Sequence, residues 1–223
     1  LGNWPPLLFS KKKNKKRLDI YWFLFVRSNM ISDKLKENIK EVLPLVVDEW
    51  NNVKLPAFES LIEKSFKDYF EGRQTQEKTK MVAPILETIF ERMLKKLEPT
   101  FVADEGKGHD YLYGDIPIEC KITCSDSGTW TGNGYAKTPI HILMSFKLED
   151  DGNITDMFCM FANLTDDIES GWGKKTSLTA NFVGLRLLSE DIDNFDVVVG
   201  EVSTKNKLLK VVRDGSYNNK FFL

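Results

Sequence analysis

The chain has 223 residues, of which 42% are hydrophobic and 29% are charged, a balance typical of a globular domain with one sizeable core. It has no apolar run near the roughly 18 residues that a membrane span requires, and its three cysteines show no metal-ligand spacing with its two histidines. We therefore expect a cytoplasmic protein with reduced thiols, without a membrane span or structural zinc.

The net charge of −2 is unevenly distributed along the chain. Residues 1–29 contain seven basic residues and one acidic residue, so the remainder carries 24 basic and 32 acidic residues, a net charge of −8. The basic run and the short aromatic-rich stretch after it are predicted to form an extension outside the domain, with Met30 as the natural start and residues 30–223 as a single domain. A nucleic-acid enzyme with this balance must gather its lysines on one surface.

Residues 31–98 show the apolar spacing of three helices. The first is expected over residues 32–50, because Ser32 is a favourable N-cap at its start. The second is expected over residues 56–70 and the third over residues 80–97.

The polar residues 73–79 are predicted to form the loop before the third helix. If the protein binds DNA, Arg73 and Lys78 in this loop are candidates for phosphate contacts. Glu87 lies on a flank of the third helix that adjoins its buried stripe.

Residues 110–123 have the pattern of a β-hairpin with its turn at Gly114 and Asp115. Because side chains alternate along a strand, Glu119 and Lys121 are expected on one face, where Asp110 meets them from across the hairpin. The alternating apolar residues are predicted to face the core: Ile118, Cys120 and Ile122. Two carboxylates offer oxygen ligands to Mg²⁺, and a lysine beside them can orient a water or stabilise charge on a phosphate.

This arrangement resembles the catalytic motif of the PD-(D/E)xK nuclease superfamily, in which an Asp opens a hairpin and a Glu-x-Lys follows on its second strand. Asp110, Glu119 and Lys121 match the motif, whereas His109 stands in place of its proline. An exposed hairpin that carries an ordinary Glu–Lys pair is the alternative interpretation of the same residues.

The resemblance implies a restriction-endonuclease-like core and a Mg²⁺ cofactor. It implies that Asp110 and Glu119 ligate the metal together with the backbone carbonyl of Cys120. Lys121 would hold and activate the attacking water and stabilise the transition state. Glu87 matches the carboxylate that the helix before the hairpin commonly contributes in this superfamily, and a solvated helix carboxylate is its alternative.

Residues 124–138 form a long polar segment directly after the proposed catalytic strand. Segments of this length are usually functional or disordered. The segment resembles the loop beyond the Glu-x-Lys strand in several type II restriction endonucleases. Thr129, Asn133 and Lys137, with His141 on the next strand, are therefore candidates for DNA contacts; a flexible surface loop and a structural histidine are the alternatives.

The remaining strands are predicted from short apolar runs separated by turn residues. They are expected over residues 101–104, 140–148, 154–164 and 177–188, with further apolar pieces at 197–200 and 208–212. A hairpin turn is expected at residues 150–153 and a short helical turn from Ser189. Together these elements predict an α/β (α+β) domain whose central mixed β-sheet is flanked by helices.

The function that we expect is that of a Mg²⁺-dependent type II site-specific deoxyribonuclease, a restriction endonuclease that cleaves double-stranded DNA. If its site is palindromic, a homodimer is expected, and a cognate DNA methyltransferase is expected as a genetic partner. Two alternatives stay open: a structure-specific repair or recombination nuclease of the same superfamily, and a non-enzymatic acidic domain that binds a basic protein. Catalysis by a nucleophile and a histidine is poorly supported, because neither histidine pairs with an evident nucleophile.

Overall fold

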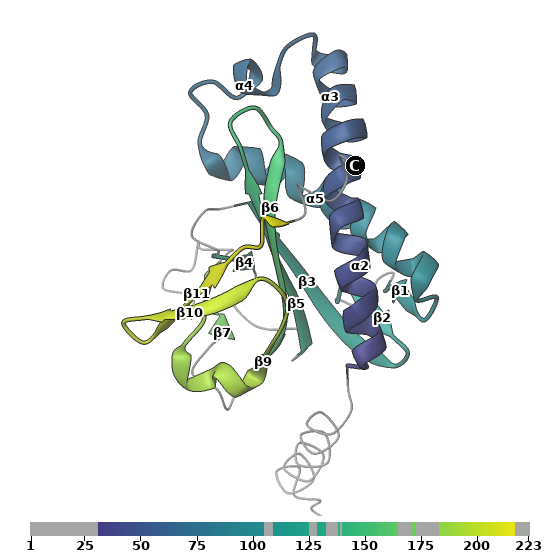
Figure 1. The fold of residues 1–223 in the computed structure, drawn as a ribbon, viewed down its shortest axis with the longest axis vertical. Coiled ribbons are helices and arrows are strands. Elements are labelled where there is room, and N and C mark those ends of the chain that lie inside the picture. The colour runs from purple at the N-terminus through teal and green to yellow at the C-terminus, as the bar shows by residue number, and fades with distance from the viewer. Residues whose placement is uncertain are drawn as a thin grey trace, which may run out of the picture. The chain divides into compact units, whose positions relative to one another are not determined.

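A six-stranded mixed β-sheet organises the unit Glu37–Leu223 in the computed structural model (Figure 1). The structure describes residues 31–104, 109–124, 129–132, 138, 140–164, 171–172 and 183–216. The strand order is β1-β2-β3-β5-β6-β9, with β3 and β5 parallel and the other neighbours antiparallel. The strands are β1 (Phe101–Ala103), β2 (Tyr111–Tyr113), β3 (Ile116–Thr123), β5 (Ile140–Leu148), β6 (Ile154–Asn163) and β9 (Phe195–Val199). The predicted α+β class with a mixed sheet is confirmed.

Five described helices precede the sheet in the chain: α2 (Asp33–Glu49), the π-helix η1 (Trp50–Lys54), α3 (Leu55–Ile62), α4 (Phe66–Tyr69) and α5 (Thr75–Leu97). The short helical turn expected from Ser189 is confirmed as the 3-10 helix η2 (Ser189–Asn194), which lies before β9. The first predicted helix is confirmed, and the backbone N–H of Leu35 donates to Ser32 Oγ at 3.1 Å as expected of an N-cap. None of the helices in the described residues is long and apolar enough to cross a membrane.

Two helix predictions were wrong in their boundaries. The second helix breaks at Glu63, which has a left-handed φ of 53° and ends α3. Ser65 Oγ then accepts from the backbone N–H of Asp68 and begins the separate helix α4. The predicted loop 73–79 is helical from Thr75. The sequence did not reveal this helical start, because the first turns of α5 are largely exposed and lack the apolar spacing that marks a buried helix.

The turn between β5 and β6 is fixed to the helices by Trp50 and Asn51 of η1. Trp50 Nε1 donates to the carbonyl of Gly152 at 2.9 Å. The Asn51 amide donates to the carbonyl of Ile154 and accepts from its backbone N–H, at 2.9 and 2.8 Å. The expected turn is confirmed, and Gly152 has a φ of 91° that a residue without a side chain adopts readily.

The sheet has two different faces, which follow from the strand register. We call the face with Tyr111 and Cys120 the α5 face, because α5 contacts β3 and its Glu87 accepts a hydrogen bond from Tyr111. We call the opposite face the Lys121 face. Lys121 is paired in register with Leu143 of β5, so the two side chains project to the same side.

A second layer covers part of the Lys121 face. It contains β4 (Thr131–Gly132), β7 (Gly171–Trp172) and β8 (Val183–Arg186) in one small sheet, and β10 (Glu201–Lys205) and β11 (Leu208–Val212) in a hairpin. Trp130 before β4, Leu185 of β8 and Leu209 of β11 are buried in one cluster with Leu143. The strand predicted over 177–188 is described only from Val183 onward.

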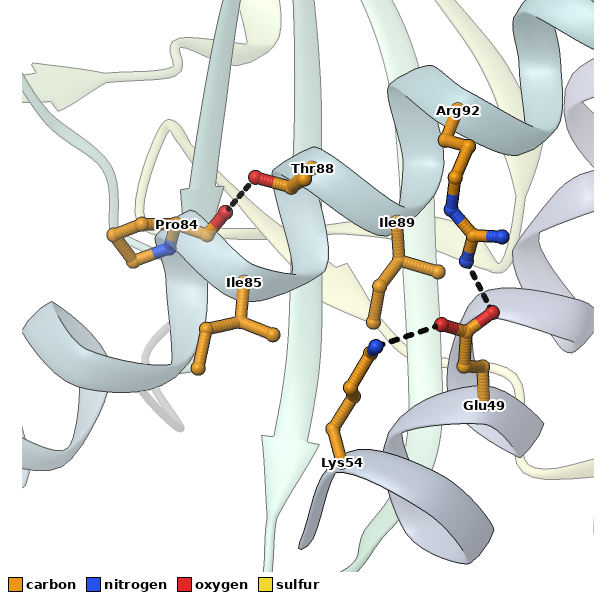
Figure 2. A pocket seen from close by; sticks show the side chains of 7 residues that line it. All are labelled: Glu49, Lys54, Pro84, Ile85, Thr88, Ile89 and Arg92. Carbon is orange, nitrogen blue, oxygen red and sulfur yellow. Dashed lines mark hydrogen bonds and ion pairs between the residues drawn. The ribbon is translucent and has the colours of Figure 1, made fainter. Parts of the chain in front are cut away.

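The junction of α2, η1 and α5 contains a pocket on the helical side of the molecule (Figure 2). Glu49 at the end of α2 forms ion pairs with Arg92 of α5 and with Lys54 of η1, the latter at 3.4 Å. Ile85 and Ile89 of α5 contribute apolar lining. These contacts link the helices to one another.

Candidate active site

The hairpin that carries the site forms as predicted, residue by residue. Tyr111 pairs with Ile118, and the backbone N–H of Asp110 donates to the carbonyl of Ile118 at 3.2 Å. Asp110 Oδ2 accepts from the backbone N–H of Cys120 at 2.8 Å. The carboxylate that precedes β2 is therefore held against the middle of β3.

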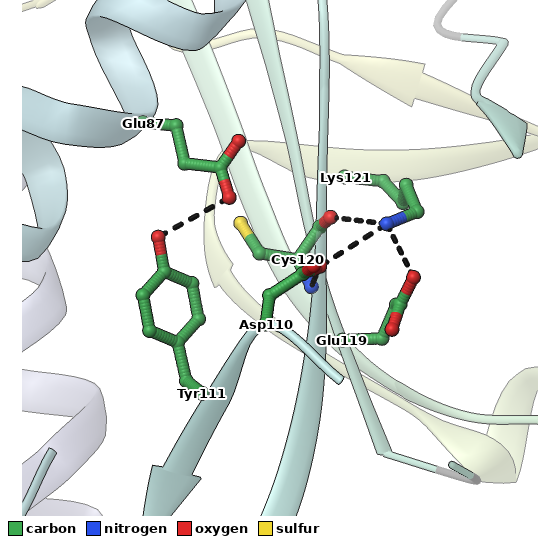
Figure 3. Close-up of polar contacts among 6 residues, drawn as sticks. All are labelled: Glu87, Asp110, Tyr111, Glu119, Cys120 and Lys121. Atoms are coloured by element: carbon green, nitrogen blue, oxygen red, sulfur yellow. Dashed lines mark hydrogen bonds and ion pairs between the residues drawn. The ribbon is translucent and has the colours of Figure 1, made fainter. Parts of the chain in front are cut away.

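Lys121 lies at the centre of the polar cluster (Figure 3). Its Nζ atom is 2.6 Å from Glu119 Oε1 and 3.1 Å from Asp110 Oδ2. It also donates to the carbonyl oxygen of Cys120 at 2.8 Å. These three acceptors belong to the three residues that the family resemblance implies as metal ligands.

The electrostatics of the cluster keep Lys121 charged. Burial disfavours the ammonium form, but the hydrogen bond to Glu119 and the charges of Asp110 and Glu119 outweigh it and raise the pKa of Lys121. The cluster therefore contains two carboxylates and one ammonium, as the sequence predicts.

Glu119 is the most deeply buried carboxylate of the cluster, with 5% of the residue exposed. Its Oε1 contacts Lys121, whereas its Oε2 is buried and has no hydrogen-bond partner among the described residues. A buried acceptor without a partner costs about 1–3 kcal/mol. On β5, His141 is paired in register with Glu119 and is fully buried, so this predicted DNA contact lies inside the protein.

Glu87 is near the cluster but on the other side of β3 (Figure 3). It accepts a hydrogen bond from the Tyr111 hydroxyl at 3.2 Å, and it lies beside the Cys120 side chain on the α5 face. Burial and the negative charge of Asp110 raise the pKa of Glu87. The structure thus couples Glu87 electrostatically to Asp110, while its hydrogen bond is to Tyr111.

His109 and Asp104 make a contact that the sequence reasoning missed. His109 Nε2 lies 2.7 Å from Asp104 Oδ2, although the two atoms are not aligned as a hydrogen bond. The Asp104 side chain is 5% exposed. Asp104 follows β1 and His109 precedes β2, so the antiparallel pairing of these two strands brings the residues together. A prediction of that strand pairing is what could have revealed the contact.

The donor set fits a hard divalent cation that keeps several of its waters. Within the described residues, no group of three or more His, Cys, Asp or Glu side chains is arranged to hold a metal. Mg²⁺ does not require such a group, because it is commonly bound through one or two carboxylates together with substrate phosphates. Asp110, Glu119 and the Cys120 carbonyl supply hard oxygen donors, and the unpartnered Glu119 Oε2 is an acceptor that such a cation would satisfy.

Apart from His141, the predicted DNA contacts outside the hairpin are not brought to this cluster by the contacts that the structure describes. Arg73 lies over the Tyr69 ring, with its guanidinium carbon 4.7 Å from the ring centroid. Lys78 pairs with Asp150 of the β5–β6 turn at 3.4 Å. Thr129 is exposed before β4, whereas two further candidates lie outside the described residues: Asn133 and Lys137.

Comparisons with protein family models, with curated proteins and with solved structures found no match.

Proposed function

We propose that the protein is a Mg²⁺-dependent endodeoxyribonuclease of the PD-(D/E)xK type, most similar to a type II restriction endonuclease. The observation that supports this best is the position of Lys121, whose ammonium lies within hydrogen-bonding distance of two carboxylates and one carbonyl oxygen. The superfamily motif requires these four groups to converge.

Asp110, Glu119 and the Cys120 carbonyl would hold the ion, which when bound would polarise the scissile phosphate and neutralise charge on it. Lys121 would hold the attacking water by hydrogen bonding and stabilise negative charge that develops on the phosphate. In the metal-free protein its raised pKa keeps it a cation. Glu87 would be a supporting carboxylate that acts on Asp110 across β3.

The test is incubation of supercoiled plasmid and phage-sized DNA with the protein in Mg²⁺, beside an EDTA control. Discrete fragments are expected in Mg²⁺ and none in EDTA. Lys121→Ala should lose cleavage by about two to three orders of magnitude, as expected when one preorganised electrostatic donor is removed. The matched control is Lys147→Ala, because Lys147 is also on the central sheet and also pairs with a carboxylate, Glu149, at 2.7 Å.

The alternatives predict different results in the same assay. Cleavage confined to branched or mismatched DNA would replace the restriction assignment with a structure-specific nuclease. An acidic protein-binding domain predicts no cleavage of any DNA and no effect of Lys121→Ala. A protein that neither cleaves DNA nor binds Mn²⁺, as measured by calorimetry, would overturn the nuclease proposal itself.

A further inference from the structure

The β10–β11 hairpin is a two-stranded antiparallel ribbon. Its strands pair from Glu201 with Val212 to Lys205 with Leu208. They are joined by Asn206 and Lys207, whose positive φ values of 52° and 64° are those of the tight turn that suits hairpin twist. This geometry fixes which side chains of the ribbon face outward.

The inner face of the ribbon anchors it to the rest of the protein. Leu209 is 7% exposed and belongs to the core cluster that contains Leu143, and Val202 and Val211 pack against the same cluster. The outer face is exposed along its whole length: Glu201, Ser203, Lys205, Leu208, Lys210 and Val212. The ribbon is thus a fixed platform rather than a loose tail.

The charge of the ribbon differs from that of the chain. Residues 201–213 contain four basic residues and one acidic residue, in a protein whose net charge is −2. Lys205, Lys207 and Lys210 are exposed, and none of them forms an ion pair with another described residue. By contrast, several lysines elsewhere are paired with carboxylates: Lys36, Lys40, Lys54, Lys78 and Lys147.

The ribbon and the candidate active site share one face of the sheet. Leu209 of the ribbon packs in the cluster of Leu143, which is paired in register with Lys121. At the base of the ribbon, Arg213 Nε donates to Ser145 Oγ at 2.8 Å. Ser145 is two residues beyond Leu143 on β5, so the base of the ribbon is fixed about 7 Å along the sheet from the level of Lys121.

We propose that this ribbon binds backbone phosphates of the duplex DNA whose cleavage the Lys121 site would perform; the inference rests on the proposed function. Contacts to phosphates fix the register of a protein on DNA without reading its sequence. A two-stranded β-ribbon is also narrow enough to enter the major groove. The outward lysines supply positive charge on the face that the DNA must approach, which an otherwise acidic chain needs.

The experiment compares two triple variants of equal charge. The ribbon variant is Lys205→Gln, Lys207→Gln and Lys210→Gln. The control variant replaces three exposed lysines of the helical layer by glutamine, and these also lack ion pairs with described residues: Lys67, Lys95 and Lys96. Binding of a short fluorescent duplex is measured in EDTA, so that no cleavage occurs, from about 50 to about 200 mM KCl.

The ribbon variant should bind more weakly, and the slope of log affinity against log salt should fall by about one for each phosphate that the ribbon no longer neutralises. The control variant should retain the wild-type slope. Thermal unfolding of both variants should match the wild type, because the substituted side chains are exposed. Mg²⁺-dependent cleavage by the ribbon variant should show a raised KM with kcat retained.

Equal slopes for the ribbon variant and the wild type would overturn the ribbon assignment, while Mg²⁺-dependent cleavage by the wild type would leave the nuclease proposal standing. Duplex binding that depends on the ribbon, in a protein that neither cleaves any DNA nor binds Mn²⁺, would support the ribbon and reject the nuclease. A wild-type protein that binds no duplex would overturn the ribbon proposal, whatever other partner the lysines serve.

Discussion

Replacing Lys121 by methionine tests whether its ammonium holds the site together. The substitution preserves most of the side-chain volume and removes the cation that contacts Glu119 at 2.6 Å and Asp110 at 3.1 Å. Without it, two carboxylates face each other in a half-buried environment and repel. The free energy of unfolding should therefore fall at neutral pH.

The size of the effect follows from the exposure of the three groups. Removing one partner of a fully buried ion pair costs about 3–5 kcal/mol, whereas an exposed pair contributes about 0–1 kcal/mol. The side chains of Glu119, Lys121 and Asp110 are 6%, 21% and 30% exposed, so we expect about 2–3 kcal/mol. In a chain of this length that corresponds to a fall in Tm of about 5–10 °C.

The pH dependence has a definite sign. The pKa of Lys121 is raised in the folded protein above the ordinary value of 10.5. Its contribution to stability is therefore complete below that value and disappears as the pH rises through the higher pKa of the folded state. The wild type and Lys121→Met should accordingly differ at neutral pH and converge in strong base.

Thermal unfolding in EDTA measures the effect, with Lys147→Met as the matched control. The Lys147–Glu149 pair is more exposed, at 43% and 37%, so its loss should cost less than about 1 kcal/mol. Mg²⁺ should then raise the Tm of Lys121→Met more than that of the wild type, because the ammonium no longer competes for the same oxygens. An unchanged Tm in EDTA would refute the ion-pair argument, and an equal Mg²⁺ effect on both proteins would refute the assignment of these oxygens to the metal.

Glu87→Gln should raise the Tm at neutral pH and lower nuclease activity. Because burial raises the pKa of Glu87, the gain in stability should vanish as the pH falls to 4.5, which a series of thermal unfolding curves would show. A gain in Tm that is independent of pH would contradict the raised pKa of Glu87. The three cysteines should react with a thiol reagent only after unfolding, because all are buried. Burial also raises their pKa values, that of Cys124 to about 12. Rapid labelling of the native protein would contradict this protection of the thiols. Gly152→Ala should cost about 2–5 kcal/mol by urea unfolding, because a Cβ at its φ of 91° would lie 2.6 Å from Phe66 Cγ. Gly72→Ala, with a φ of 73° and open space around it, should cost only about 1–2 kcal/mol, and equal losses for the two variants would contradict the steric argument.

The hairpin could be predicted from the sequence because every signal for it is local. Apolar residues alternate with Glu119 and Lys121, and Gly114 takes the positive φ of 59° that its turn requires. Asp110 meets Lys121 because the turn fixes the register of the two strands. A motif confined to one hairpin is therefore readable without knowledge of the rest of the fold.

The helix boundaries depended on tertiary contacts that no local pattern contains. The residues predicted as one helix over 56–70 break so that Phe66 and Phe70 fold back on Phe58, with ring centroids 6.0 and 6.5 Å away. The backbone N–H of Phe66 donates to Glu59 Oε1 across the break at 2.6 Å. Apolar periodicity alone continues through this segment, which is why it predicts one helix.

The surroundings of the site depend on the parallel pairing of β3 with β5, two strands that a long connection separates in the sequence. That pairing places His141 beside Glu119 in the interior, whereas alternation along β5 alone shows only that His141 shares a face with the polar Ser145. The second layer buries this face as well, through Leu185 and Leu209. Alternation identifies which residues share a face, but only the fold decides whether that face is exposed.

The spacing of Glu119 and Lys121 has a reason in folding as well as in catalysis. The carboxylates of Asp110 and Glu119, which meet on one face of the hairpin, would repel in the metal-free protein. Lys121, two residues from Glu119, projects to the same face and pairs with both. An ordinary structural ion pair would show the same spacing, so the motif by itself does not distinguish the two roles. The ion pair uses Glu119 Oε1, and Oε2 is buried with no hydrogen-bond partner in the part of the chain that the structure describes. Since such an acceptor costs about 1–3 kcal/mol, Oε2 is the atom that the ion pair leaves unexplained and a bound cation would satisfy.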